Sequence, residues 1–572
     1  MSIDIETYRL KAQEAIEYVF VKEYHNSLGI PMPIVKMLLP DDANYSTGQY
    51  YITIDKTWQI HLNFGKLPIS YHEFQNEVKV LTRHEIEHYM CCPFDVITHF
   101  RMLKRIRDVY YKHFSHLGIN IEYACGAISN QAADIIVDTK NYYRHSKETL
   151  KSEIDWIKIG ANISACPRHC KLMFLTKEAI WKEDLGINET DPEFLKIVHQ
   201  LADSFTKNGI EDKSSFLDKV EEYAEIFFKL YVEDQKNPQQ SSQQGSQQQS
   251  GQHGSQQQSG QQGSQQQSGQ WGVGRPKDGD EHGNAFVFAD PDKVKEAIEA
   301  LAEETSVEEF IDLLAIAGII GMSDKQKGVL WFNVQSANII PIVEFSNTGN
   351  KSSYTYPSVW RIGDPIEELD LMLTYMTSPR LIPGMTTKKW EYVSNDDNGT
   401  ESKQMDLLLV VDTSGSMGSA MKESANMHQA VLASYGILSY FESTKSKVAF
   451  IGFSDKIDAY VDWTDKYDDV RERLLTNGHG GTKFPISRIK STLDVKSRDL
   501  VTVLITDGDL GNINESVSYF RDYLNDDNKL YIFLLGGSKS LHSYEPLKNI
   551  GAKIYNANNA NEFCDMVLTD ME

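Results

Sequence analysis

The chain has 572 residues and a formal net charge of −24, from 81 Asp and Glu against 57 Lys and Arg. At roughly 150 residues per domain the length predicts about four domains. The apolar share of 41% is that of a globular protein and excludes wholesale disorder. The acidic balance argues against nucleic acid or anionic membrane as the main partner, because both bind clusters of Lys and Arg.

Location is predicted from the signals that the sequence lacks. The first residues follow an acidic amphipathic pattern with no basic segment leading into an apolar one, and no apolar run is long enough to span a bilayer. Six cysteines do not indicate a disulfide-built secreted scaffold. We therefore expect a cytoplasmic protein that acts away from the membrane.

The pattern before residue 236 is mainly helical. Apolar residues recur at helical spacing in several segments, and a strand-like piece at 50–54 and 59–62 precedes the second of them. The helical segments are 8–24, 71–90, 96–114, 129–143 and 216–232. Residues 1–235 are therefore assigned to one mainly α-helical domain.

A stretch rich in Gln, Ser and Gly divides the chain. From Gly245 a nonapeptide recurs in three near-identical copies that end at Trp271. These residues bury little apolar surface, so the sequence predicts a disordered tether over 236–284. Helical patterns at 292–303 and 307–318 follow, and then an irregular, aromatic-rich region. Residues 285–403 are treated as a connecting α+β region.

The last segment, 404–572, alternates between apolar strands and helices. Strand runs without polar alternation indicate strands that are buried on both faces. The strand runs are 404–411, 447–453, 500–506, 530–535 and 553–555, and the helices are 421–441, 465–475 and 514–525. This order predicts a doubly wound, Rossmann-like α/β domain with a parallel sheet, whose ligand site lies at the carboxyl ends of the strands.

The helix at 71–90 contains the motif HExxH. His84 and His88 are four residues apart and share one helical face, so both imidazoles can reach one metal ion. Glu85 is placed to act as a general base on water that zinc activates. A third protein ligand is required, and a later helix offers Asp134 and Asp138 on one face. Asp134 is the preferred third ligand and Asp138 the partner of a histidine; the reverse assignment stays open.

Oxygen-bearing side chains gather at the predicted carboxyl ends of the C-terminal strands. Asp412, Ser414 and Ser416 follow the first strand. Thr482 lies in a later glycine-rich loop, and Asp507 follows another strand. Carboxylate and hydroxyl oxygens are the ligands that Mg²⁺ prefers. The sequence therefore predicts a site for Mg²⁺ or another divalent cation.

These five positions resemble the metal-ion-dependent adhesion site (MIDAS) of von Willebrand factor A domains, in which a DxSxS motif, a threonine and an aspartate hold the ion. The resemblance covers about residues 406–572. It implies that Mg²⁺ keeps an open coordination position, which accepts a carboxylate from a protein partner or substrate. It implies binding and not catalysis for this domain.

The order of motifs along the chain resembles that of HExxH metallopeptidase-like proteins that carry a C-terminal von Willebrand factor A-like domain. Residues 84–88, 130–138 and 480–485 carry the resemblance. It implies a zincin-like fold for the N-terminal domain, with Zn²⁺ and peptidase (hydrolase) activity. It also implies a partnership with MoxR-type AAA+ ATPases. One departure is Asp138, which stands where the family usually has Asn.

Two functions follow from these features. The first is a zinc metallopeptidase-like protein with a Mg²⁺-dependent protein-binding domain. The alternative is a non-enzymatic adaptor or co-chaperone of an AAA+ ATPase, in which the N-terminal metal is structural. An open coordination position beside Glu85 favours the first, and a closed four-ligand site favours the second. The chain has no Walker motif, so a partner must supply any ATP hydrolysis.

Overall fold

The computed structural model of the chain describes residues 5–42, 50–54, 59–64, 70–159, 163–236, 291–319, 322–337, 353–360, 388–393, 405–495, 500–508, 510, 512–526, 528–536 and 542–557. Apart from Lys236, which ends a helix, the tether predicted from the sequence lies outside these residues. In the part of the chain so described, no helix combines the length and the apolar character that a bilayer span needs.

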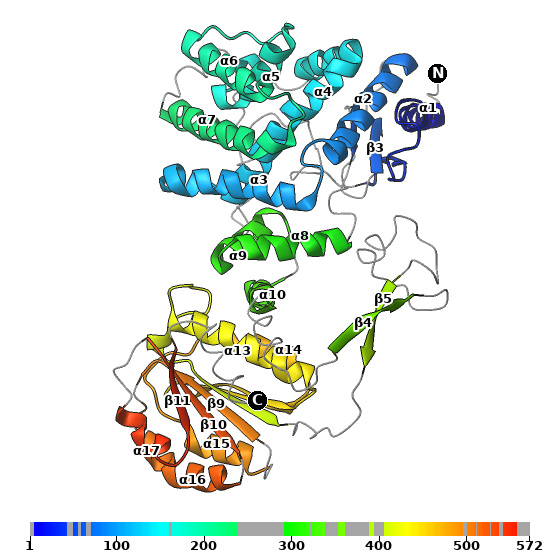
Figure 1. The fold of residues 1–572 in the computed structure, drawn as a ribbon. Helices are drawn as coiled ribbons and strands as arrows, with labels where there is room; N and C mark the ends of the chain where they lie inside the picture. The colour runs from blue at the N-terminus through cyan, green and yellow to red at the C-terminus, as the bar shows by residue number, and fades with distance from the viewer. Residues whose placement is uncertain are drawn as a thin grey trace. The chain divides into compact units, whose positions relative to one another are not determined.

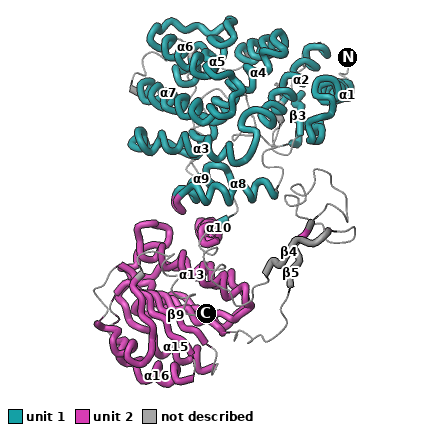
Figure 2. Tube along the Cα trace, in the orientation of Figure 1, with its two compact units in different colours: residues 1–305, 309–322 teal, residues 306–308, 323–572 magenta. Residues whose placement is uncertain are grey.

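The chain forms two compact units, shown in Figure 2. The first contains residues 1–305 and 309–322, and the second contains residues 306–308 and 323–572. The division falls inside the region 285–403 that the sequence treats as one connecting segment. The two helices that follow the predicted tether thus belong mainly with the N-terminal unit.

The first unit is a helical domain with one small sheet (Figure 1). Its helices are α1 (Ile5–Glu17), α2 (Tyr71–Met90), α3 (Val96–Val109), α4 (Ile121–Ile159), α5 (Arg168–Trp181), α6 (Pro192–Thr206), α7 (Phe216–Lys236), α8 (Pro291–Glu304) and α9 (Val307–Ile316). Short π-helical segments at Tyr18–Glu23 and Tyr110–Phe114 continue α1 and α3. Helices α5 and α6 are absent from the sequence prediction. Helix α5 is buried on most of its surface, which removes the amphipathic period that identifies a helix.

The small sheet supports α2. It contains β1 (Ile34–Met37), β2 (Tyr50–Ile54) and β3 (Gln59–Phe64) in the order β1-β3-β2. Strand β1 is parallel to β3, and β2 is antiparallel to it. Alternate residues of β3, Ile60 and Leu62, are fully buried in one apolar cluster with Phe74 and Val78 of α2. This packing fixes the helix that carries HExxH.

The second unit contains a six-stranded sheet in the order β11-β10-β9-β6-β7-β8. Its helices and strands are α10 (Asp324–Ala337), β4 (Ser353–Val359), β5 (Lys388–Val393), β6 (Asp406–Asp412), α13 (Asn426–Ser443), β7 (Val448–Phe453), β8 (Ile457–Thr464), α14 (Tyr467–Leu474), α15 (Ile486–Leu493), β9 (Leu500–Thr506), α16 (Val517–Asn525), β10 (Lys529–Leu535), α17 (Glu545–Lys548) and β11 (Lys553–Ala557). Strands β4 and β5 form a separate antiparallel pair.

The sheet of the second unit is mixed rather than wholly parallel. Strand β8 pairs antiparallel with β7, while all the other neighbours are parallel. Residues 454–456 join β7 to β8, and so short a connection permits only an antiparallel pair. Strand β8 lies at the edge and is largely half-buried or exposed. It therefore lacks the continuous apolar run that identifies the central strands.

Helices cover both faces of this sheet. Helices α13 and α14 lie on one face, and α15, α16 and α17 lie on the other (Figure 1). Leu408 and Val410 of β6 belong to one core cluster with Ile489 of α15 and Phe520 of α16. The doubly wound arrangement expected from the sequence is thus present, and it brings the carboxyl ends of β6 and β9 to one edge.

The irregular region expected from about residue 328 begins inside a helix, α10, which ends at Ala337. Its aromatic side chains are buried against α13 of the same unit. The Trp331 ring centroid lies 5.4 Å from that of His428, and the Phe332 centroid lies 5.5 Å from that of Tyr435. The helix was missed because most of its apolar residues are consecutive, at 329–332, and so do not line one face; the contact with α13 stabilises it.

Candidate metal sites

Local signals and buried charges position helix α2. Ser70 caps the helix, since its hydroxyl accepts a hydrogen bond from the Glu73 N–H and donates one to the Glu73 carboxylate at 2.9 Å. Ser70 and Glu73 have the residue types and the spacing of a capping box. Further along, the fully buried Glu87 accepts a hydrogen bond from the Tyr24 hydroxyl at 2.9 Å and pairs with Lys140 of α4 at 2.8 Å. The HExxH segment is thus held against α4.

Three ligand atoms converge between α2 and α4. The Nε2 atoms of His84 and His88 lie 3.1 Å apart. Oδ1 of Asp134 lies 3.5 Å from the first of these nitrogens and 3.3 Å from the second. Ligands about 2.0–2.1 Å from a tetrahedral zinc ion lie roughly 3.3–3.4 Å from one another. The three atoms therefore have the spacing of a zinc site.

The hydrogen bonds of the two imidazoles decide their tautomers. Nδ1 of His88 lies 2.8 Å from the carbonyl oxygen of Cys92, which can only accept, so Nδ1 carries the proton. Nδ1 of His84 donates to Oδ1 of Asp138 at 2.7 Å. In the neutral imidazoles Nε2 is therefore the nitrogen with the free lone pair, and both Nε2 atoms face Asp134, as in the ligand form of histidine.

Asp134 contributes an oxygen that is buried and has no hydrogen-bond partner in the described structure, Oδ1. Its other oxygen accepts a hydrogen bond from the Asn130 amide at 3.1 Å. An unpaired carboxylate oxygen facing two imidazole lone pairs is costly unless a cation lies between them. The residues present thus fit a divalent metal ion.

The pKa values in this cluster reflect the same attraction for positive charge. Burial opposes protonation of His88, but the adjacent Asp134 carboxylate and the charge of Glu85 outweigh burial and raise the pKa of His88 to about 9. Burial raises the pKa of Asp134, but His88 and His84 outweigh it, so the net shift is downward. Both shifts indicate a site that favours a cation between the three side chains.

Asp138 belongs to a buried network behind His84. Its second oxygen, Oδ2, accepts a hydrogen bond from Lys177 of α5 at 2.5 Å, and Lys177 also donates to Glu153 at 3.0 Å. Because Asp138 contacts the Nδ1 edge of His84 and Asp134 faces the Nε2 edge, the geometry favours Asp134 as the ligand. The sequence analysis missed Lys177 and Glu153, because no local sequence pattern predicts that a lysine in an apolar helix has a buried carboxylate partner.

The second candidate site lies where β6 and β9 end. Asp412 is fully buried, and its two oxygens accept hydrogen bonds from the Ser414 N–H at 2.8 Å and the Thr506 hydroxyl at 2.6 Å. The Ser414 and Ser416 hydroxyls lie 3.1 Å apart, and the Ser416 hydroxyl donates to Asp507 at 3.0 Å. Four of the five oxygen-bearing residues expected from the sequence are thus brought together.

Thr482, the fifth, lies in the loop beside this cluster. The Gly415 N–H donates to the Gly480 carbonyl oxygen at 3.3 Å, which ties the two loops together. Gly480 has a φ of +111°, and a Cβ there would lie 3.0 Å from a carboxylate oxygen of Asp455. Within the described residues, no hydrogen bond joins the Thr482 side chain to the other four.

The charge balance of this second site also favours a cation. Burial raises the pKa of Asp412, the hydrogen bonds from Thr506 and Ser414 oppose that shift, and the charge of Asp507 adds to it. Asn426, which the sequence did not single out, orients Asp507 by donating to its second oxygen at 3.1 Å. Carboxylates and hydroxyls are the only side-chain groups in this set of potential ligands, and that composition suits Mg²⁺.

Comparisons with known proteins add little to this geometry. No family model matches the chain, and no curated protein matches it. Among solved structures, the chain is similar to the conserved hypothetical protein BatB from Bacteroides thetaiotaomicron, with 13% identity and a TM-score of 0.25. The match covers 29% of this chain and 97% of that one. At this TM-score the similarity carries no functional argument.

Proposed function

We propose that the chain is a zinc-dependent metallopeptidase whose second unit is a cation-dependent protein-binding domain of the von Willebrand factor A type. The observation that carries the proposal is the convergence of His84 Nε2, His88 Nε2 and Asp134 Oδ1 at 3.1–3.5 Å. None of the described residues adds a fourth His, Cys, Asp or Glu ligand to this cluster. Three protein ligands and an open position are the pattern of catalytic zinc, whereas structural zinc has four.

The residues around the cluster have separate roles in peptide hydrolysis. Zinc held by His84, His88 and Asp134 would act as a Lewis acid and would lower the pKa of a water molecule to about 7. Glu85 accepts a proton from the attacking water and delivers it to the leaving amine. Asp138 holds His84 in the tautomer that presents Nε2, and the Cys92 carbonyl does the same for His88.

In this proposal the second unit binds a protein partner or substrate and takes no part in peptide hydrolysis. Asp412, Ser414, Ser416, Thr482 and Asp507 would hold Mg²⁺, and the ion would bind a carboxylate of a protein partner or substrate. Holding a captured protein near the peptidase unit raises its local concentration. A MoxR-type AAA+ ATPase in the cytoplasm remains our expected partner, on the resemblance of the motifs alone.

The metal content of three variants tests the zinc site. Purified wild type is expected to contain one zinc per chain by elemental analysis. His84→Ala and Asp134→Ala each remove a ligand and should contain almost none. Asp138→Ala should retain zinc with an affinity lowered about 10–100-fold, because it removes only the partner of a ligand.

The matched control is His72→Ala, an exposed histidine on the same helix whose ring contacts Asn76. It should leave zinc unchanged. Full zinc in both His84→Ala and Asp134→Ala would disprove the site. Loss of zinc in Asp138→Ala with retention in Asp134→Ala would reverse the two aspartate assignments.

The affinity for Mn²⁺, a stand-in for Mg²⁺ with the same ligand preference, tests the second site. In zinc-loaded protein, Ser416→Ala and Asp507→Asn should each lower Mn²⁺ affinity at least about tenfold, measured by electron paramagnetic resonance, because losing a direct ligand costs at least as much as losing an outer partner. Ser443→Ala, an exposed serine at the end of α13, is the control. Unchanged affinity in both site variants would exclude the proposed ligands.

A further inference from the structure

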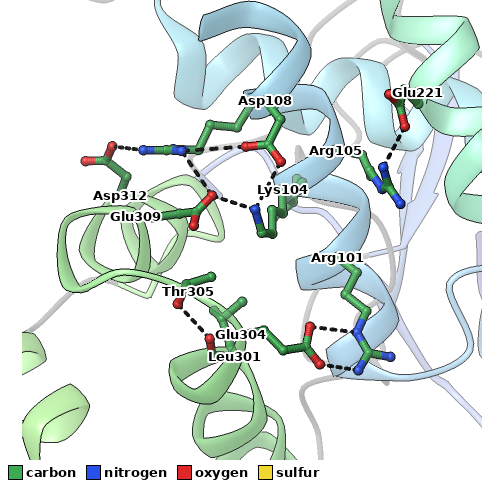
Figure 3. Close-up of polar contacts among 12 residues, drawn as sticks. Arg101, Lys104, Arg105, Asp108, Glu221, Leu301, Glu304, Thr305, Glu309 and Asp312 are labelled. Atoms are coloured by element: carbon green, nitrogen blue, oxygen red, sulfur yellow. Dashed lines mark hydrogen bonds and ion pairs between the residues drawn. The ribbon is translucent and has the colours of Figure 1, made fainter. Parts of the chain in front are cut away.

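Helices α8 and α9 pack against α3, although residues 237–290 separate them from α7 (Figure 3). We name α8 and α9 together the acidic hairpin. Two α3 side chains make direct ion pairs with it. The Arg101 guanidinium donates to Glu304 with Nε at 3.0 Å, and Lys104 Nζ lies 2.7 Å from Glu309.

A third basic residue of α3, Arg107, completes the row. Its two terminal nitrogens contact Glu309 at 3.3 Å and Asp312 at 2.8 Å. Arg107 and Glu309 are mostly buried, while Asp312 is nearly half exposed. The basic residues recur every three residues and therefore follow one face of α3. Three acidic residues of the hairpin meet that face, and one of them, Glu309, contacts both Lys104 and Arg107.

Apolar burial accompanies the ion pairs. Leu301 of α8 and Phe310, Leu313 and Leu314 of α9 are all fully buried. Any apolar surface of these side chains that the rest of the unit covers would be exposed if the hairpin left, and exposing apolar surface is unfavourable. The ion pairs then set the orientation of the hairpin on α3 and the salt dependence of its binding, while the apolar side chains supply most of the affinity of the hairpin for α3.

We propose that the acidic hairpin binds α3 as an intramolecular ligand and joins the two parts of the chain without help from residues 237–290. Residues 237–290 then begin after α7 and end before α8, and both helices belong to the first unit. With the hairpin bound, residues 317–323 alone lead on to α10. These seven residues can span at most about 25 Å.

While the hairpin is bound, residues 237–290 are thus not the connection between the two units. The basic face of α3 is the surface responsible, and an acidic helical segment is the ligand that it fits.

Cutting the loop tests the proposal in the full chain. A recognition site for a specific protease is inserted among residues 245–271, and the cleaved protein is analysed by size-exclusion chromatography with light scattering. The two fragments should elute together with the mass of one intact chain. Separate fragments in low salt would overturn the proposal. A complex with the mass of two chains would also overturn it, because the hairpin would then come from a second copy.

Charge reversal identifies the surface. Lys104→Glu with Arg107→Glu should weaken association of the cleaved fragments by about tenfold or more, because two partly buried pairs become repulsive. Adding Glu309→Lys and Asp312→Lys to this double variant should restore association. Unweakened association in the double variant, or failure of the restoring changes, would exclude the ion pairs.

The control reverses a neighbouring charge that does not contact the hairpin. Arg105 lies on the same helix and pairs with Glu221 of α7 at 2.8 Å (Figure 3). Arg105→Glu should leave the fragments associated as in wild type. Equal weakening by Arg105→Glu would show that any charge reversal on α3 disrupts the unit, and it would contradict a specific hairpin surface. Circular dichroism and zinc content of each variant establish that the first unit is folded.

Discussion

Replacing Glu85 by glutamine is expected to abolish peptide hydrolysis while leaving zinc in place. The amide cannot accept a proton from water, and removing a general base lowers a rate by about 10²–10⁴-fold. Glu85 lies outside the group of metal-ligand atoms, so the ligand set is intact. Hydrolysis of fluorescently labelled casein measures the first effect, and elemental analysis measures the second.

The control for this prediction is Glu77→Gln, which makes the same change about two turns earlier on α2 and should have wild-type activity. Hydrolysis by Glu85→Gln at the wild-type rate would remove Glu85 from the mechanism. A wild-type protein that holds zinc and cleaves neither casein nor unfolded peptide mixtures would favour the adaptor, in which the metal is structural. Zinc content thus tests the metal site, and hydrolysis tests the catalytic role, independently of each other.

Replacing Lys177 by methionine is expected to have the largest effect on the stability of the first unit. Lys177 is almost completely buried and pairs with Asp138 and Glu153, which are also buried. Burial by itself would lower its pKa, but the two carboxylates outweigh burial and raise it. Without the lysine, two buried carboxylates have no neighbouring cation. Removing one partner of a buried ion pair lowers the free energy of unfolding by roughly 3–5 kcal/mol.

The same substitution should also weaken zinc binding. Asp138 would no longer be held against Nδ1 of His84, and losing such an outer partner costs about 10–100-fold in metal affinity. Competition with a chelator measures the affinity, and amide hydrogen exchange of α2, α4 and α5 measures local stability. A purely structural role for Lys177 would change exchange and leave the affinity of the folded protein unchanged.

A matched substitution in the same helix separates this network from general damage to α5. Lys171 is also mostly buried but pairs with Glu189 at 2.9 Å, away from Asp138. Lys171→Met should leave zinc affinity at the wild-type value. Adding Glu153→Gln to Lys177→Met removes one of the two uncompensated charges, so it should recover part of the lost stability. Equal zinc loss in Lys171→Met would contradict a specific role for Lys177.

Several elements of the fold were predictable because their signals are local. The helix carrying HExxH shows an apolar period, and its boundaries match the prediction at both Tyr71 and Met90. The central strands β6, β7, β9 and β10 are unbroken apolar runs and were found within a few residues. Strand β8 and helix α10 were missed, since one is an edge strand and the other has a weak apolar stripe.

The candidate sites show the same division. Spacing alone placed His84 and His88 on one face, because a helix repeats every 3.6 residues. Spacing could not separate Asp134 from Asp138, since both occupy the same face of α4. The tilt of α4 against α2 decides that Asp134 faces the Nε2 atoms and that Asp138 faces Nδ1.

By itself, the sequence determined the types of the two sites: imidazoles four residues apart on a helix, and acidic and hydroxyl side chains just after apolar strands. Both depend on backbone periodicity, which is a property of neighbouring residues. Only the tertiary structure decided that Lys177 supports Asp138 and that α8 and α9 return to α3 across residues 237–290. Those contacts join residues that are far apart in the chain, and packing brings them together, which no local pattern encodes.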